Sequence, residues 1–368
     1  MIDSKDFVKA FKKQNIDYFV GVPDSVLDTF IHFLHSQKRE LTHRVAANEG
    51  GAIGLATGYA ISKKKIPVVY FQNSGLGNAI NPLTSMVDKK VYGIPMILVI
   101  GVRGGFNFRD ELQHHKMGPI TLKILKSLGI PYKIVNEKKF NNQIKYAVKY
   151  SKTYSHPFAL IIKHNSFKKD KNFKILDNQK EKFKRYEYIE ALLKSLKKNT
   201  YLVGSTGFAT REINYFAKNQ NLNISKFFYC IGAMGHANQI ANEIALQKKK
   251  NKVIIIDGDG SLIMHLGNLS TIKKNLPKNF MHIVFDNKMH ESTGGHPVSD
   301  ANINFKLIFK AFGYKKIFEI DNPYKLVNIL KMKNSSITAV IIKTKPGTIN
   351  NLPRPSHEDL IYFKKNFS

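Results

Sequence analysis

The chain has 368 residues, of which 43% are hydrophobic, and it carries a formal net charge of +31. That length suffices for two domains of ordinary size, each with its own core. No run of about 18 apolar residues is present, which excludes a predicted membrane span and a membrane partner. Cys230 is the single cysteine, so no disulfide can form within the chain. Because the first residues also lack the apolar stretch of a signal peptide, the sequence fits a cytoplasmic enzyme.

The excess of positive charge raises the alternative of a nucleic-acid-binding protein. The lysines are spread along the whole chain rather than gathered in one stripe, and no zinc-finger or RNA-recognition signature is present. We therefore attribute the lysine content to compositional bias or to attraction of an anionic substrate. We expect no nucleic-acid partner; a protein that did bind DNA would do so with a steep dependence on salt.

Short apolar runs, which predict strands, cover residues 18–23, 68–71, 96–101 and 158–162. Runs that are apolar at nearly every position are typical of parallel strands covered on both faces. After the first run, apolar residues recur at helical spacing, at Val26, Leu27, Phe30, Ile31 and Leu34. The alternation of strands and helices predicts an α/β domain with a parallel sheet over residues 1–165.

The polar, lysine-rich residues 166–184 predict a linker. Apolar runs resume at residues 201–204, 253–256, 282–285 and 338–342, which predicts a second α/β domain over residues 185–368. The two halves have similar patterns, but no residue-level repeat relates them.

Polar motifs in the first half follow predicted strands or begin a predicted helix. Asp24 lies in Gly21-Val22-Pro23-Asp24-Ser25, and Glu49 is the single carboxylate among the small and apolar residues 46–56. Burial of Glu49 would raise its pKa and let it share a proton. Taken alone, a carboxylate that interacts with a helix dipole is the simpler interpretation. The loop after residues 96–101 adds four polar candidates, namely Arg103, Arg109, His114 and His115.

In the second half, the strand at residues 253–256 leads into Asp257-Gly258-Asp259-Gly260-Ser261, and Asn287 follows 28 positions after Asp259. A carboxylate and a neutral oxygen suit Mg²⁺, while glycines let backbone N–H groups approach phosphate oxygens. A helix start after the turn adds a favourable dipole. The spacing therefore predicts a site for a divalent cation and a diphosphate.

Three further segments of the second half contain candidate residues, and two of them follow predicted strands, where open α/β sheets bind ligands. They contain Ser205 and Thr206, then Gly232 and Met234 in a glycine-rich turn, then Ser292 and Thr293 after the metal Asn. Carboxylates and histidines in such a site can relay protons, which makes Asp24, His114 and His115 candidates beside Glu49. Arg103, Arg109, Ser292 and Thr293 are candidates for binding an anionic headgroup.

Gly-Asp-Gly followed after such a gap by Asn resembles the signature of thiamine-diphosphate-dependent enzymes. The resemblance implies that Asp259, Asn287 and the backbone carbonyl of Met289 hold Mg²⁺. It places Gly258, Gly260, Ser261, Ser205 and Thr206 around the diphosphate. It further implies that Glu49 hydrogen-bonds the aminopyrimidine ring, that the carbonyl of Gly232 accepts from the amino group, and that Met234 bends the cofactor.

Members of this family have a pyrimidine-binding domain and a diphosphate-binding domain, and many carry a third between them. The chain is too short for a middle domain, so the resemblance implies two domains with the pyrimidine domain first. It also implies sites shared between subunits, and hence a homodimer or a larger assembly.

Within the family, the chain resembles the phosphonopyruvate decarboxylases over nearly its whole length. The motifs are Gly-Val-Pro-Asp-Ser, Asn-Glu-Gly-Gly-Ala, Asp-Glu-Leu-Gln-His and Gly-Ala-Met-Gly-His, and the segment Leu352-Pro353-Arg354-Pro355. The segment 105–109 and the pair His296-Pro297 depart from that pattern and leave the headgroup open. The implied reaction converts 3-phosphonopyruvate to phosphonoacetaldehyde and CO₂ in phosphonate biosynthesis.

The nearest alternative is a sulfopyruvate decarboxylase, which shares the chemistry and the two-domain plan. A single fused chain and the Gly-Val-Pro-Asp-Ser motif are interpreted as favouring the phosphonate. A carboligase of the acetolactate type would be larger and would usually carry the middle domain.

Overall fold

The structure is a computed structural model that describes the chain except for residues 38–39, 108–109, 170–180, 300, 334 and 368. The chain divides into two compact units. The first comprises Met1–Ile175 and the short segment Thr293–Asp300; the second comprises Leu176–Ser292 and Ala301–Ser368. Each unit is described by itself.

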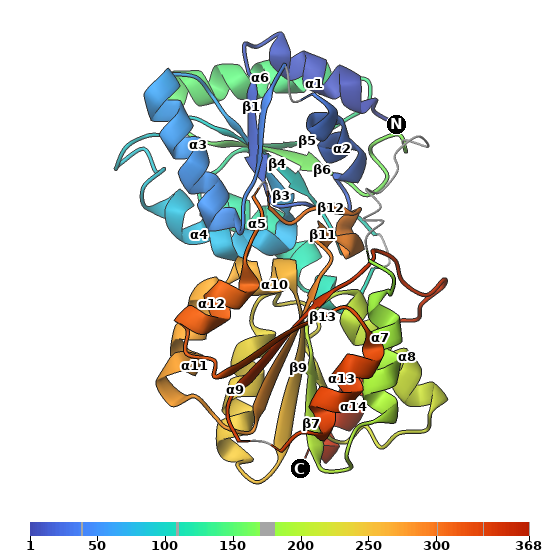
Figure 1. The fold of residues 1–368 in the computed structure, drawn as a ribbon. Coiled ribbons are helices and arrows are strands. Elements are labelled where there is room, and N and C mark those ends of the chain that lie inside the picture. The colour runs from blue at the N-terminus through green and yellow to red at the C-terminus, as the bar shows by residue number, and fades with distance from the viewer. Residues whose placement is uncertain (38–39, 108–109, 170–180, 300, 334, 368) are drawn as a thin grey trace. The chain divides into compact units, whose positions relative to one another are not determined.

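The first unit contains a six-stranded parallel sheet in the order β2-β1-β3-β4-β6-β5 (Figure 1). Its strands are β1 (Tyr18–Gly21), β2 (Thr42–Val45), β3 (Val68–Gln72), β4 (Ile97–Gly101), β5 (Tyr132–Ile134) and β6 (Phe158–Ile162). Its helices are α1 (Ser4–Lys12), α2 (Asp28–Ser36), α3 (Glu49–Lys63), α4 (Leu76–Thr84), α5 (Met117–Ser127) and α6 (Phe140–Tyr154), with the 3-10 turns η1 (Asn73–Gly75) and η2 (Leu112–His114). The short strand β12 (His296–Pro297) also belongs to this unit.

The second unit contains a six-stranded parallel sheet in the order β13-β14-β10-β9-β7-β8. Its strands are β7 (Thr200–Gly204), β8 (Phe227–Tyr229), β9 (Lys252–Gly258), β10 (Phe280–Asp286), β13 (Lys316–Ile320) and β14 (Thr338–Lys343), with the short β11 (Met289–His290). Its helices are α7 (Arg185–Lys194), α8 (Phe208–Asn219), α9 (Ala237–Gln247), α10 (Asp259–Met264), α11 (Leu269–Asn275), α12 (Phe305–Ala311), α13 (Pro323–Lys331) and α14 (His357–Asn366). The 3-10 turns are η3 (Leu266–Asn268) and η4 (Glu291–Thr293).

The two sheets have the same topology. If the six sheet strands of each unit are numbered in chain order, both sheets run 2-1-3-4-6-5 from one edge to the other. The chain therefore repeats one architecture twice, although no sequence repeat marks it. The prediction of two parallel-sheet α/β domains is confirmed, and no third domain lies between them in the described residues.

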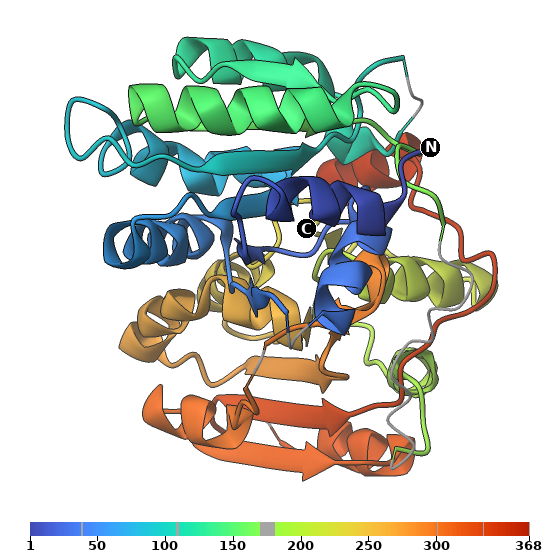
Figure 2. The ribbon, with the colours of Figure 1, turned by 90° about the horizontal axis from the view of Figure 1, so that it is seen from above.

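Helices cover both faces of each sheet (Figure 2), and apolar strand residues alternate between the two faces. In β4, Ile97 and Val99 pack on one side while Leu98 and Ile100 pack on the other. Burial on both faces explains why these strands read as continuous apolar runs. The same burial provides the main driving force for folding of each unit, at about 25 cal/mol per Å² of apolar surface.

All eight strands predicted from apolar runs are present, and they are the eight interior strands of the two sheets. The four sheet strands that the apolar runs did not reveal, β2, β5, β8 and β13, are the four edges. The predicted helix after β1 is present as α2, with Phe30, Ile31 and Leu34 buried. None of the helices in the described part of the chain has the length and apolar character needed to cross a membrane.

Candidate active site

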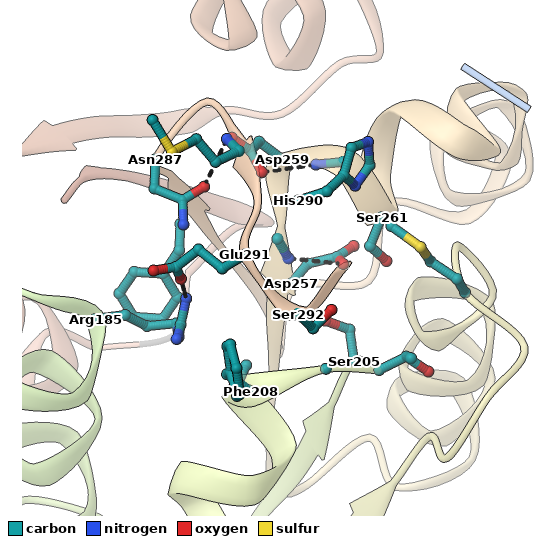
Figure 3. A pocket seen from close by; sticks show the side chains of 18 residues that line it. Arg185, Ser205, Phe208, Asp257, Asp259, Ser261, Asn287, His290, Glu291 and Ser292 are labelled. Carbon is teal, nitrogen blue, oxygen red and sulfur yellow. Dashed lines mark hydrogen bonds and ion pairs between the residues drawn. The ribbon is translucent and has the colours of Figure 1, made fainter. Parts of the chain in front are cut away.

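In the second unit, Asp259 stands at the turn between β9 and α10, where the predicted cation site begins. The side chain is buried at 4% exposure, and its Oδ1 accepts a hydrogen bond of 2.7 Å from the amide of Gly260. Its Oδ2 accepts one of 2.6 Å from the amide of Lys288, which follows β10. The carboxylate therefore connects the ends of two neighbouring strands (Figure 3).

Asn287 lies directly after β10 and is also buried. Its Oδ1 accepts a hydrogen bond of 3.0 Å from the amide of Met289, and Lys288 between them adopts a left-handed backbone with φ 61°. This tight turn brings Asn287 and Asp259, 28 residues apart in sequence, to the same edge of the sheet (Figure 3).

Electrostatics at this edge oppose a bare negative charge. Burial, and next the negative charge of Asp286, raise the pKa of Asp259 to about 8. Burial also raises the pKa of Asp286. A divalent cation would reverse this preference, because it stabilises the ionised carboxylate. The hard oxygen donors of Asp259 and Asn287 thus fit Mg²⁺.

Ser205 and Thr206 follow β7 and line the same pocket as Asp259 and Ser261. Ser205 is buried, and its amide bonds to the carbonyl of Ile256 at 2.9 Å. The hydroxyl of Thr206 donates to the carbonyl of Cys230 at 2.7 Å and is also hydrogen-bonded to that of Gly232. Thr206 therefore holds the Gly232 turn, and its proton is committed to that role in this structure.

The glycine-rich turn after β8 uses left-handed backbone at Gly232, Ala233 and Gly235, with φ of 71°, 44° and 87°. The amide of Gly235 donates to Oγ of Ser261 at 3.2 Å. Because Ser261 accepts that bond, its hydroxyl proton can be donated to a ligand. Met234, on the same turn, is half-buried and lines the pocket.

A buried ionic network, which the sequence did not reveal, supports this pocket. Arg185, at the start of α7, contacts both oxygens of Glu212 at 2.8 and 2.9 Å and forms a second ion pair with Glu291 (Figure 3). Glu291 also accepts from the amide of Gly347, and Glu212 from the hydroxyl of Thr348 at 2.7 Å. The two carboxylates raise the pKa of Arg185 against the opposing effect of burial. The network therefore holds Glu291 in place, two positions after the predicted cation ligand Met289.

In the first unit, Glu49 is the first residue of α3, where the side chain of Asn48 caps the helix by accepting from the amide of Gly51 at 2.8 Å. Glu49 is 5% exposed, and its Oε2 accepts a bond of 2.7 Å from Nδ2 of Asn78. Burial raises the pKa of Glu49, and the Asn78 bond offsets part of the rise. A Cβ at Gly75 would overlap the Glu49 carboxylate, so a larger residue there would require the carboxylate to shift.

Asp24 follows β1 and is fully buried. Burial raises its pKa to about 7, while the amides of Val26 and Leu27 and the charge of Arg103 act more weakly in the other direction. No side chain of the described residues donates a hydrogen bond to it. A carboxyl that changes its charge near neutral pH suits proton transfer.

Arg103, after β4, is bound by acidic side chains of its own loop. Its guanidinium contacts Asp110 at 2.7 and 2.5 Å and Glu111 at 3.1 Å, and donates to Oγ of Ser25 at 2.9 Å. Its pairing lowers the pKa of Asp110 well below the usual range, against the effect of burial. Binding of a substrate anion by Arg103 therefore stays a prediction, and it would require the guanidinium to exchange one of these partners.

The remaining predicted residues occupy different places. His114 is buried in η2, whereas His115 is exposed and bonds through Nε2 to the carbonyl of Asp110 at 2.9 Å. Ser292 lines the pocket of the second unit, while Thr293 belongs to the first unit. Arg109 lies outside the described residues.

The structure thus gathers two groups of predicted residues. The second unit holds the cation and diphosphate candidates around Asp259, and the first holds Glu49, Asp24, Arg103 and His114. Sequence reasoning missed Arg185, Glu212, Asn78 and Gly75. Glu291 had a local signal, since it follows the metal Asn, but nothing near Arg185 indicated a partner 106 positions away.

Comparisons with known proteins match both units to one family. The model described as thiamine pyrophosphate enzyme, N-terminal TPP binding domain, matches residues 4–118, and its C-terminal counterpart matches residues 203–342. The phosphonopyruvate decarboxylase of Streptomyces viridochromogenes is 27% identical and aligns with 96% of this chain and 91% of its own length. The sulfopyruvate decarboxylase of Methanosarcina acetivorans is 25% identical, with 97% of this chain and 96% of that protein covered. The β subunit of the sulfopyruvate decarboxylase of Methanocaldococcus jannaschii is 36% identical, with 44% of this chain and 85% of that subunit covered.

Proposed function

The chain belongs to the thiamine pyrophosphate enzymes, and on that premise we propose that it decarboxylates 3-phosphonopyruvate to phosphonoacetaldehyde and CO₂. The observation that carries the proposal is the alignment, over nearly the full chain, with proteins named as decarboxylases of small anionic 2-oxo acids. The buried Glu49 and the Asp259 edge supply the side chains that such chemistry needs.

The cofactors proposed are thiamine diphosphate and Mg²⁺. Asp259, Asn287 and the carbonyl of Met289 would hold the cation, and Ser205 and Ser261 would donate to the diphosphate. When bound, thiamine diphosphate supplies an electron sink for the electron pair released as CO₂ leaves. The protein contributes position, charge and exclusion of water.

Glu49 is proposed to bind the pyrimidine ring of the cofactor. Burial raises the pKa of Glu49, which favours the protonated carboxyl group. In that form Glu49 can donate a hydrogen bond and later take the proton back. Asn78 holds the other oxygen in place. Asp24, with its pKa of about 7, and His114 or His115 would deliver the proton that replaces the carboxyl group in the product.

The choice of phosphonate over sulfonate rests on the Gly21 to Ser25 motif. Contrary to the expectation from the sequence, a single fused chain does not separate the two substrates, since a protein named sulfopyruvate decarboxylase also aligns over 96% of its own length and 97% of this chain. Sulfopyruvate is therefore the second candidate substrate, and the β subunit that is 36% identical favours it specifically.

The deciding experiment measures aldehyde formation from phosphonopyruvate, sulfopyruvate and pyruvate, each with and without thiamine diphosphate and Mg²⁺. We expect turnover that requires both cofactors and is at least about tenfold faster with phosphonopyruvate, equivalent to about 1.4 kcal/mol in the barrier. A preference for sulfopyruvate would replace the substrate and keep the chemistry. Absence of turnover with all three would contradict the proposed function.

The proposal includes a homodimer or larger assembly with shared sites and a place in phosphonate biosynthesis, in the cytoplasm. It predicts that sedimentation with cofactor shows no monomer at micromolar protein. A monomer that keeps full activity would contradict shared sites.

A further inference from the structure

A cluster of two histidines and an aspartate lies in the first unit and includes none of the residues proposed above for catalysis. Helix α2 places Asp28 and His32 one turn apart, and the segment Thr293–Asp300 of the same unit brings His296 to them. Nε2 of His32 and Nε2 of His296 lie 2.9 and 3.0 Å from the same Oδ1 of Asp28. Both imidazoles are buried, at 6% and 0% exposure, with ring centres 4.0 Å apart.

A backbone oxygen completes the cluster. The carbonyl of Gly294 lies 2.9 Å from Nε2 of His32. Gly294 has φ 107°, and a Cβ there would overlap Oδ1 of Asp28, so the close approach requires glycine. Two imidazole nitrogens, one carboxylate oxygen and one carbonyl oxygen therefore converge on one small volume.

We propose that Asp28, His32, His296 and the carbonyl of Gly294 bind one divalent cation of the Zn²⁺ class. Zinc takes four such ligands at about 2.0–2.2 Å in a tetrahedron, which sets its ligand atoms roughly 3.4 Å apart. The Nε2 to Oδ1 distances of 2.9 and 3.0 Å need an increase of only about 0.4–0.5 Å to admit the ion. Imidazole nitrogen selects this class over Mg²⁺, which prefers oxygen ligands.

Two arrangements would bring these atoms close together. In the proposed one, both imidazoles are neutral and each Nε2, without its proton, faces the ion. The competing interpretation is a purely hydrogen-bonded cluster, in which each imidazole donates its Nε2 proton to Asp28.

A second acidic cluster in this unit, formed by Asp110, Glu111 and His114, lacks the same capacity. The guanidinium of Arg103 already occupies its carboxylates at 2.5 and 3.1 Å. A bound cation there would have to displace a cation that is part of the fold. In the Asp28 cluster, by contrast, the carboxylate pairs with two imidazoles, which become ligands when they lose a proton.

The proposed ion would fasten the Thr293–Asp300 segment to α2 by coordinate bonds. Thr293 follows Ser292 directly in the chain, and Ser292 lines the pocket of the second unit. The ion would thus fix one end of the loop that begins at Asn287. This inference is independent of the proposed substrate, because it depends only on side chains of the first unit.

The test uses the full chain in buffer with saturating Mg²⁺, so that the Asp259 site does not compete. Zn²⁺ binding is measured by equilibrium dialysis, and Co²⁺ binding by the visible absorption that tetrahedral nitrogen and oxygen ligands produce. We expect one site per chain, lost in His296→Gln and in His32→Gln with at least about 100-fold weaker binding. His156→Gln, a buried histidine of the same unit whose Nε2 lies 3.1 Å from the carbonyl of Gly129, is the matched control and should keep the site.

X-ray absorption of the Zn²⁺-loaded wild-type protein needs no variant and remains decisive if a substitution prevents folding. It should show two imidazoles and nitrogen or oxygen ligands at about 2.0–2.2 Å. The inference is overturned if no stoichiometric binding occurs with Mg²⁺ present, if the absorption shows no imidazole, or if His156→Gln weakens binding as much as His296→Gln.

Discussion

The two units build their candidate sites at the same topological positions from different kinds of residue. After the first strand of the sheet, the first unit has Asp24 and the second unit has Ser205 and Thr206. After the second strand, the first unit has Glu49 and the second unit has the Gly232 turn. After the fourth strand they have Arg103 and Asn287. Ligands of open α/β sheets gather at these carboxyl ends, so both units use the same edge.

The two units differ in the ionisable groups that they present at this edge. The first unit presents buried carboxyl groups, Glu49 and Asp24, whose pKa values burial raises. The second presents hydroxyls and glycine turns around the carboxylate of Asp259, which we propose binds a cation. Each also contains an arginine between two carboxylates, Arg103 in the first and Arg185 in the second. On the proposed function, one fold would serve proton transfer in one copy and cofactor binding in the other.

The largest expected effect is on binding of the cofactor, which it separates from the catalytic step. Asp259→Ala removes the carboxylate ligand, so Mg²⁺-dependent binding of thiamine diphosphate should weaken by more than about 100-fold. Calorimetric titration of the cofactor measures this directly. Unchanged affinity would mean that the second unit does not hold the cation through Asp259.

The buried ion network of the second unit should dominate its stability. Arg185→Met leaves Glu212 and Glu291 buried without their partner, which should cost about 3–5 kcal/mol in the free energy of unfolding. Lys194→Met, on the same helix, breaks the exposed pair with Glu190 and should cost less than about 1 kcal/mol. Equal losses in urea unfolding would show that Arg185 contributes no more than a surface residue.

Asp24 should give the first unit a stability that falls with pH. Its pKa is 3.8 when unfolded and about 7 when folded, so the folded chain binds more protons between these values. Stability is full below pH 3.8 and declines until about pH 7. Asp24→Asn should therefore exceed wild type by up to about 4 kcal/mol at pH 8 and by less than about 1 at pH 4.

Urea unfolding at both pH values checks this prediction. Asp6→Asn, on the exposed face of α1, is the control and should change the free energy by less than about 1 kcal/mol at either pH. An Asp24→Asn difference that does not grow with pH would show that Asp24 is ionised in the folded chain.

The smallest predicted effect concerns the position of Glu49. Gly75 has an ordinary φ of −74°, so alanine suits its backbone, but the new methyl would displace the Glu49 carboxylate. Gly75→Ala should lower kcat by about 10–100-fold, since small misplacements of a catalytic group are costly. Gly77→Ala, where a Cβ meets open space, should stay within about twofold. Equal kcat values for the two variants would contradict a positioning role.

Sequence revealed the interior strands of both sheets and missed the four edge strands. Three of these, β2, β5 and β13, are only partly buried, and β8, which is mostly buried, is only three residues long. Interior strands such as β9 are buried on both faces and read as apolar runs, whereas edge strand β2, Thr42–Val45, alternates exposed and half-buried residues. The repeated topology was invisible because it depends on pairing order rather than on residue identity.

In the candidate site, sequence predicted the residues that stand in short motifs and missed the partners that lie far away along the chain. Asp259, Asn287 and Glu49 stand in short motifs whose spacing carries their chemistry. The partners that hold Glu49, Arg185 and Asp28 come from 29, 106 and 268 positions away, and one sequence contains no signal for such pairing.

Glu49→Gln is the most direct test of the proposal that the first unit transfers protons while the second unit binds the cofactor. Cofactor affinity and phosphonopyruvate turnover are measured on the same protein. The account predicts a Kd for thiamine diphosphate within about threefold of wild type and a kcat lower by about 10²–10⁴-fold, because only the proton-transfer group is lost. Full turnover, or turnover that falls only because the cofactor no longer binds, would contradict the assignment of the chemistry to the first unit.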